Sequence, residues 1–157
     1  RQGEVVTLAP GLDPSIVKSQ VIEQVQEKQE GIQLESASIV IGGGRGMGGP
    51  EPFATELKEL ADLLGAGIGA SRAAVDMEWM PSSAQVGLTG KTITPDLYIM
   101  VAISGASQHM AGCSGAKIIV AINRDPEANV FKDARYGVTG DWKNVLPAFT
   151  QQVRELL

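Results

Sequence analysis

Short apolar runs that end in glycine or a small polar residue recur from residue 37 onward, and no other feature limits the possible folds as strongly. They occupy residues 38–41, 66–71, 97–103, 117–122 and 136–139. The runs at 97–103 and 117–122 are apolar at nearly every position, as in strands buried on both faces. Helical spacing of apolar residues extends from Phe53 to Leu64 and stops at Gly65, and further helices are expected near 106–112 and from 144 or 147 to 157. This alternation predicts an α/β fold with a mostly parallel sheet and helices on both faces.

Length and charge exclude several classes of protein. The chain has 157 residues, the length of one domain, and buries enough surface to fold without a metal or a disulfide. Its net charge of −5 and its lack of a basic tract argue against a nucleic-acid partner. Apolar stretches fall short of the roughly 18 residues of a membrane span, so we expect neither a span nor a signal peptide. The single cysteine, Cys113, is consistent with a reducing compartment.

Residues 1–36 differ from the rest of the chain. Gly3–Ala9 fits a short strand, and apolar residues at helical spacing continue from Asp13 to about Glu30 beside a wide polar face. Such a helix packs on the following domain or belongs to a neighbour. The chain opens on Arg1 rather than Met, which predicts a processed protein or an excised domain.

The glycine-rich turn after the first expected strand is a candidate binding element. Gly44–Gly49 fits the G-x-G-x-x-G pattern between a strand and a helix, where backbone N–H groups bind phosphate, and Arg45 adds a cation. A glycine turn without a ligand is the alternative. The second strand ends in Ser71 and Arg72, where a standard NAD-binding fold carries an acidic residue for the ribose. The turn therefore predicts phosphate binding but disfavours a standard NAD site.

Two other motifs do not support a function. Gly90-Lys91-Thr92 lacks the partner glycine of a P-loop, because position 85 is Gln. His109 and Cys113 lie four residues apart on an expected helix, but two ligands do not make a zinc site. We expect no metal, and we expect Cys113 to be a packed residue rather than a nucleophile.

Small or polar residues follow four of the expected strands. They are Ser71-Arg72, Ser104–His109, Asn123–Asp125 and Gly140-Asp141. Because open α/β sheets bind ligands beyond the carboxyl ends of their strands, these residues predict one long ligand groove. The groove offers no acid–base pair and no activated nucleophile, which fits the binding of a cofactor better than the cleavage of a substrate. Asp125 and Asp141 have helix capping as an alternative role.

Together these segments resemble the C-terminal, FAD-binding domain of the electron transfer flavoprotein alpha subunit. The matching stretches, in family order, are Gly43–Gly46, Gly69–Asp76, Gln85–Lys91, Leu97–Ile99, Ile103–Ala106, Gln108-His109, Ala111-Gly112 and Ile119–Pro126. The resemblance implies a Rossmann-like domain of the DHS-like NAD/FAD-binding type at residues 37–157. Residues 1–36 are then the linker and remnant of an N-terminal domain.

The same resemblance implies a function. The cofactor is FAD, the partner is the electron transfer flavoprotein beta subunit in a heterodimer, and the protein is an electron carrier without catalytic residues. It takes electrons from flavin dehydrogenases, such as the acyl-CoA dehydrogenases of fatty acid beta-oxidation, and passes them to a downstream acceptor. We expect a cytoplasmic, prokaryotic location rather than the mitochondrial matrix.

Individual roles follow from the resemblance as well. Arg72 matches the arginine beside the isoalloxazine ring, where a cation stabilises the anionic reduced flavin by up to ~4 kcal/mol at 4 Å and an effective dielectric constant of about 20. Thr89 matches the hydroxyl that bonds flavin N5, and His109 the imidazole near flavin O2. The residues implied to bind the cofactor are Arg45, Ser71, Arg72, Gln85, Val86, Gly87, Leu88, Thr89, Ser104, Gly105, Ala106, Ser107, Gln108, His109, Asn123, Asp141 and Trp142.

The sequence departs from the family pattern near these residues. Leu88 stands where many relatives have glutamine, the segment Met100–Ala102 is bulkier than usual, and Met77-Glu78 replaces a frequent Ala-Gly. These changes leave FAD binding intact and bear on the redox behaviour.

Two other functions compete with this interpretation. An NAD-dependent transferase of the deoxyhypusine synthase kind shares the expected fold type and needs a Schiff-base lysine, for which Lys91 is the candidate. A cofactor-free interaction domain is the second alternative, expected if the chain has lost FAD affinity without its partner.

Overall fold

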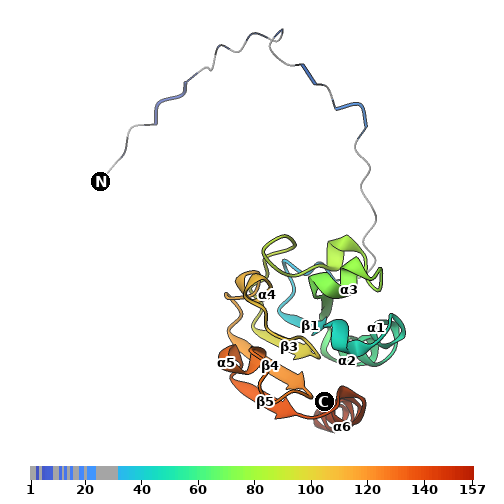
Figure 1. The fold of residues 1–157 in the computed structure, drawn as a ribbon. Coiled ribbons are helices and arrows are strands. Elements are labelled where there is room, and N and C mark those ends of the chain that lie inside the picture. Colours follow the sequence, from blue (N-terminus) through green and yellow to red (C-terminus); the bar gives the residue numbers. More distant parts are fainter. Residues whose placement is uncertain are drawn as a thin grey trace.

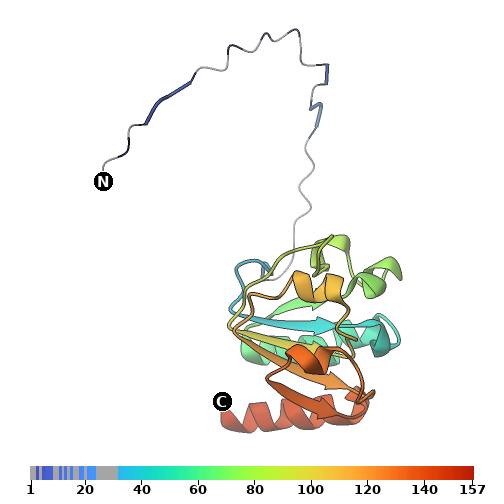
Figure 2. The ribbon, with the colours of Figure 1, turned by 60° about the vertical axis from the view of Figure 1, so that its left-hand side comes forward.

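Five parallel strands form one sheet in the order β2-β1-β3-β4-β5 (Figures 1 and 2). The computed structural model describes residues 3, 5–8, 11, 13, 15, 18–19, 21–23 and 32–157. The strands are β1 (Ile39–Gly43), β2 (Gly67–Ala70), β3 (Leu97–Val101), β4 (Ile118–Asn123) and β5 (Tyr136–Thr139). Every pair of neighbours is parallel, so the carboxyl ends of all five strands lie at one edge of the sheet.

The strand order reverses between β1 and β3. From β1 the chain moves outward to β2, and it then returns to the other side of β1 to form β3, β4 and β5. This is a doubly wound arrangement, in which ligands bind at the point of reversal. The predicted α/β fold with a parallel sheet is confirmed.

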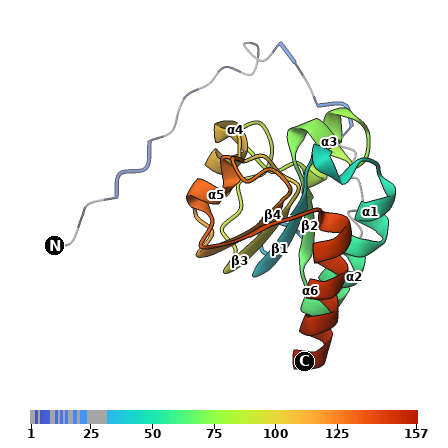
Figure 3. The ribbon, with the colours of Figure 1, turned by 60° about the horizontal axis from the view of Figure 1, so that its bottom comes forward.

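Both faces of the sheet are covered, and each has its own apolar core. Alternate residues of the central strands point to opposite faces, so Ile99 and Val101 join one core and Tyr98 and Met100 the other. The first core packs against α1 (Glu51–Ala54), α2 (Glu56–Leu64), α3 (Arg72–Asp76) and α6 (Trp142–Leu156). The second lies under α4 (Ser107–Ala111) and α5 (Val130–Asp133), which Figure 3 shows across the sheet from α2 and α6.

Glycine and aspartate set the ends of the two longest helices. Gly65 follows α2 with φ 60°, and its N–H bonds to the Ala61 carbonyl, as expected for the predicted helix end. The last helix begins at Trp142, earlier than expected, because the Asp141 carboxylate accepts the Lys143 N–H at 3.0 Å. The short helices α3 and α5 were missed, since four or five residues show no helical periodicity.

The elements predicted before residue 32 are not seen among the described residues there. Gly3 and residues 5–8, from the strand expected at Gly3–Ala9, carry no strand. Among the described residues, none forms a strand beside this run, and a strand without a partner is unstable in water. The helix expected from Asp13 to Glu30 lies mostly outside the described residues, and residues 18–19 and 21–23 are not helical.

Among the residues that the structure describes, no helix combines the length and the apolar character needed to cross a bilayer.

Candidate functional site

A cavity of about 930 Å³ opens at the carboxyl ends of the strands, around the point where the strand order reverses. Binding sites for small molecules usually measure about 300–1,000 Å³, so this cavity suits a large ligand. A second cavity of about 230 Å³ adjoins it. The two share Gly46, Ala102, Asn123 and Arg124 as lining residues, so they follow one another along the sheet edge.

The glycine turn after β1 forms one wall of the larger cavity. A Cβ on Gly44 would overlap the Ala102 carbonyl, so only glycine lets the turn pass this close to the end of β3. The Gly44 N–H donates to Val101 at 2.9 Å, and the Trp142 indole donates to the Gly46 carbonyl at 3.1 Å. The turn is thus held between β3 and α6, with the exposed Arg45 beside the cavity.

Ala102 holds an unusual backbone conformation where the two cavities meet. It has φ 54°, one of two positive values among the described non-glycine residues. A left-handed conformation costs a residue with a Cβ roughly 1–2 kcal/mol. Such outliers concentrate at ligand sites, where the surrounding structure maintains them. The other outlier is Glu78, with φ 60°.

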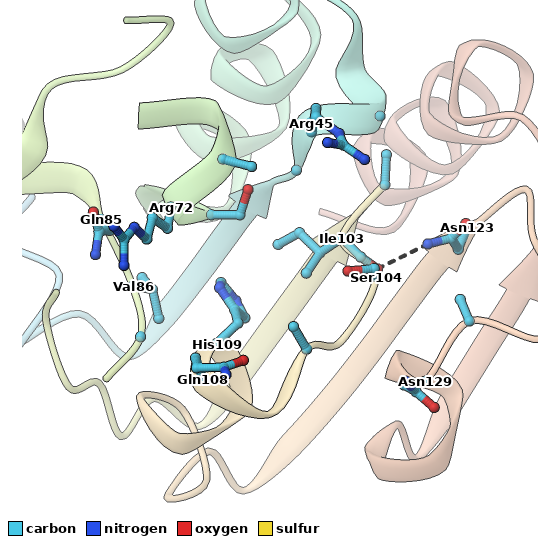
Figure 4. A pocket seen from close by; sticks show the side chains of 18 of the residues that line it. Arg45, Arg72, Gln85, Val86, Ile103, Ser104, Gln108, His109, Asn123 and Asn129 are labelled. Carbon is cyan, nitrogen blue, oxygen red and sulfur yellow. Dashed lines mark hydrogen bonds between the residues drawn. The ribbon is translucent and has the colours of Figure 1, made fainter. Parts of the chain in front are cut away.

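Ser71 and Arg72 lie where β2 passes into α3. Ser71 is the residue before the helix, and its hydroxyl oxygen is buried without a hydrogen-bond partner in the described part of the chain. Arg72 extends its side chain with 68% of it exposed, and its Nε lies 3.5 Å from Asp76. Figure 4 shows Arg72 and Arg45 across the cavity from Gln108 and His109.

His109 lines the larger cavity opposite Arg45 and Arg72 and, unlike these exposed arginines, is buried. The side chain is 6% exposed, and Nε2 lies 3.0 Å from the Tyr98 hydroxyl. Its Nδ1 is buried and has no hydrogen-bond partner among the described residues. Burial lowers the pKa of His109 to about 4, and the nearby Val86 backbone opposes this only in part. The imidazole is therefore neutral at pH 7.

The segment from Gln85 to Lys91 contributes its first five residues, Gln85–Thr89, to the lining of the cavity. The Val86 N–H donates to Ala70 at 3.0 Å, and the Leu88 N–H donates to Gln108 at 2.7 Å, so the segment bridges β2 and α4. Within it, the Gln85 amide donates to the Thr89 hydroxyl at 2.9 Å. The side chain of Leu88 lies at the rim and is mostly exposed.

Lys91 does not lie where the transferase alternative needs an amine. It is not among the residues that line either cavity, and its Nζ lies 2.9 Å from the Glu35 carboxylate. A Schiff-base lysine has to be uncharged and reach the ligand. The geometry of Lys91 therefore argues against the deoxyhypusine synthase-like function.

Asn123 ties the ends of β3 and β4 together. Its amide donates to the Ile103 carbonyl at 2.9 Å, the dashed line in Figure 4, and accepts the Asp125 N–H at 3.0 Å. One amide proton and further lone pairs remain for a ligand. Asp141 caps the start of α6, so the alternative role of helix capping is confirmed for this residue. Asp141 also lines the smaller cavity.

Most of the predicted cofactor residues come together in the larger cavity. Thirteen of them line it: Arg45, Ser71, Arg72, Gln85, Val86, Gly87, Leu88, Thr89, Ser104, Ala106, Gln108, His109 and Asn123. Asp141 and Trp142 line the smaller cavity instead, and Gly105 and Ser107 line neither. For all of them, contact with the cofactor stays a prediction.

Several lining residues were not among those implied to bind the cofactor. They are Gly44, Gly46, Ala73, Asp76, Ala102, Ile103, Arg124, Asp125, Glu127, Ala128 and Asn129. Arg124 and Asp125 belong to the groove predicted from the strand ends, and Gly44 and Gly46 to the predicted glycine turn, so the structure places these four in the cavity as expected. Within the described part of the chain, no group of three or more His, Cys, Asp or Glu residues is placed to hold a metal ion.

Comparison with known proteins identifies related sequences. The family model described as the electron transfer flavoprotein FAD-binding domain matches residues 33–114, just over half of the chain. The electron transfer flavoprotein subunit alpha of Thermoanaerobacterium thermosaccharolyticum is 45% identical over 156 residues, covering 99% of this chain and 47% of that protein. The Paracoccus denitrificans subunit alpha is 49% identical over 146 residues, covering 93% and 46%.

A mitochondrial relative gives a similar match. The electron transfer flavoprotein subunit alpha of Dictyostelium discoideum is 50% identical over 129 residues, covering 82% of this chain and 36% of that protein. The chain thus spans less than half the length of each of these three relatives.

Proposed function

Because the chain belongs to the electron transfer flavoprotein family through its FAD-binding domain, we propose that it holds FAD in the two adjoining cavities and serves as an electron carrier. FAD is the cofactor of this family. The single observation that supports the site best is the position of these cavities, which run along the strand ends from the point of reversal.

The polar atoms of the site fit such a cofactor. The Ser71 hydroxyl and His109 Nδ1 are buried without hydrogen-bond partners in the described chain, and both residues line the larger cavity. Buried polar atoms are nearly always paired, so each calls for a polar atom of a ligand. Arg45, Arg72 and Arg124 also line this cavity, and cations suit a pyrophosphate and a flavin that becomes anionic when reduced.

Bound FAD supplies the redox chemistry, by accepting and releasing electrons. The protein residues position and tune it. Arg72 would supply a positive charge beside the ring, Thr89 a hydroxyl and His109 a neutral imidazole, while Arg45 and Ser71 would bind the phosphates. Asn123, Asp141 and Trp142 border the smaller cavity, which suits the adenosine half.

The partner and the electron donors belong to the same proposal. Relatives are named as alpha subunits, which supports a beta subunit as the partner in a heterodimer. Flavin dehydrogenases, acyl-CoA dehydrogenases among them, are the proposed donors. Relatives occur in bacteria and in mitochondria, and we propose a cytoplasmic location for this chain.

Electron acceptance is tested with the FAD-loaded protein and a beta subunit from a close relative. A catalytic amount of acyl-CoA dehydrogenase with its acyl-CoA substrate should bleach the flavin absorbance of the heterodimer. Dithionite serves as the control that the bound flavin can be reduced. Bleaching by dithionite but by none of a panel of flavin dehydrogenases would contradict the carrier function and leave FAD binding in place.

A further inference from the structure

A buried tyrosine is hydrogen-bonded to His109, which lines the larger cavity. Tyr98 on β3 has no exposed surface, and its hydroxyl lies 3.0 Å from His109 Nε2. The two rings are close to parallel, at 23°, with centroids 6.0 Å apart. Gly42 on β1 makes room for the phenol, because a Cβ there would overlap the hydroxyl. The pair is therefore packed in a fixed arrangement.

The direction of the hydrogen bond follows from what the Tyr98 hydroxyl can reach. In the described part of the chain, His109 Nε2 is its one hydrogen-bond partner. Burial raises the pKa of this hydroxyl well above its usual value, so it keeps its proton and needs an acceptor. A buried O–H without an acceptor destabilises the folded state. Nε2 is thus the acceptor, and a neutral imidazole that accepts at Nε2 carries its proton at Nδ1.

Among the described residues, the second nitrogen of the ring forms no well-aligned hydrogen bond, although the Val86 backbone lies near enough to the imidazole to raise its pKa in part. Nδ1 is buried and unpaired among the described residues, and His109 lines the cavity that Figure 4 shows. Cys113 packs below in the same core and is itself neutral, since burial raises the pKa of its thiol to about 12. The charged residues that line the cavity are Arg45, Arg72, Asp76, Arg124, Asp125 and Glu127. None of these carboxylates is in an ion pair with His109 in the described chain.

We propose that Tyr98 is a positioning residue for the cofactor site: its hydroxyl donates to His109 Nε2 and fixes the neutral imidazole in the tautomer with the proton on Nδ1. The N–H group then sits on the nitrogen that forms no well-aligned hydrogen bond among the described residues, with only the Val86 backbone nearby, and an acceptor atom of the ligand completes it. This consequence rests on the proposed function, whereas the tautomer itself does not.

The tautomer is measured on the FAD-free protein by ¹⁵N NMR of the imidazole. His109 is the only histidine in the chain, so its signals need no assignment. At pH 7 the wild type should show a protonated Nδ1 and an unprotonated Nε2. Tyr98→Phe should lose this preference and give a mixture or the opposite tautomer. Tyr136→Phe is the matched control, because Tyr136, the other tyrosine, is exposed on the edge strand β5 and should leave the signals unchanged.

If Tyr98→Phe does not fold, a second labelling experiment tests the same hydrogen bond. In a Tyr136→Phe background, 3-fluorotyrosine enters only at Tyr98 and makes its hydroxyl a stronger donor. The ¹⁵N signal of Nε2 should then shift further toward that of a hydrogen-bonded acceptor. A proton on Nε2 in the wild type, or ¹⁵N signals that ignore both changes at Tyr98, would overturn the proposal.

The reduction potential gives the functional readout. With FAD and a beta subunit bound, Tyr98→Phe should shift the flavin potential, and Tyr136→Phe should not. An unchanged potential in Tyr98→Phe overturns the role of Tyr98 toward the cofactor. A wild type that shows the expected tautomer but never retains FAD refutes the proposed function instead.

Discussion

The two walls of the larger cavity carry different kinds of electrostatics. The wall built from the glycine turn and the start of α3 presents Arg45 and Arg72, whose side chains are exposed. The wall built from α4 presents His109, which is almost fully buried and hydrogen-bonded to Tyr98. The two arginines thus carry a full charge on exposed side chains, whereas His109 presents an uncharged polar group on a buried, hydrogen-bonded one.

Desolvation explains why the two walls differ. A buried cation needs a paired anion, and among the described residues none pairs with His109, so the imidazole stays neutral. An arginine keeps its charge at a water-exposed position, although water weakens its effect. We call the side with Arg45 and Arg72 the arginine wall and the side with His109 the histidine wall. Substitutions that change the backbone or the charge test the arginine wall, and a change of pH tests the histidine wall.

The largest effect is expected from Gly44→Ala on the arginine wall. The new Cβ overlaps the Ala102 carbonyl, so the turn or the end of β3 has to move. We expect a loss of about 3 kcal/mol or more in the free energy of unfolding, measured by urea denaturation, and a loss of FAD binding. Gly48→Ala is the control, because Gly48 has φ 85° with open space around it, and should cost only about 1 kcal/mol. Equal losses in the two variants would contradict the packing described for the turn.

The pH dependence of stability tests the burial of His109 without any substitution. The folded-state pKa of His109, about 4, lies below the usual 6.5, so the unfolded chain binds more protons between these values. Stability should therefore fall as the pH drops from 6.5 toward 4, by about 2 kcal/mol between pH 7 and pH 5. Denaturation curves of the FAD-free protein measure this. His109→Gln should remove most of the dependence in this range, and parallel curves for the two proteins would show that His109 is not buried as described.

A smaller effect is expected when the charge of the arginine wall is removed. Arg72→Ala should lower the reduction potential of the bound flavin, because the anionic reduced form loses a nearby cation. Exposure weakens the interaction to about 1 kcal/mol, or roughly 40 mV for a one-electron step. Spectroelectrochemical titration measures the shift, and Arg135→Ala, beside a different cavity, is the control. Equal reduction potentials for Arg72→Ala and the wild type would contradict the position proposed for Arg72 beside the flavin.

The sequence predicted the sheet and most of the cavity lining because both depend on local patterns. Five apolar runs gave five strands, and the small or polar residues after them met at one edge by the geometry of parallel strands. The Tyr98–His109 bond was not predicted, because it joins a strand to a helix 11 residues later through a side-chain packing that periodicity does not encode. The positive φ of Ala102 was missed for a similar reason, since alanine gives no local signal for that conformation.

Retention of FAD tests the central claim most directly. The visible absorption spectrum of the purified protein is recorded before and after FAD is added and the sample desalted, alone and with a beta subunit. We expect two flavin bands to survive desalting, with about one flavin per chain when the beta subunit is present, and to be lost in Gly44→Ala. Absence of flavin from the wild type even with a beta subunit bound would contradict the assignment of these cavities to FAD.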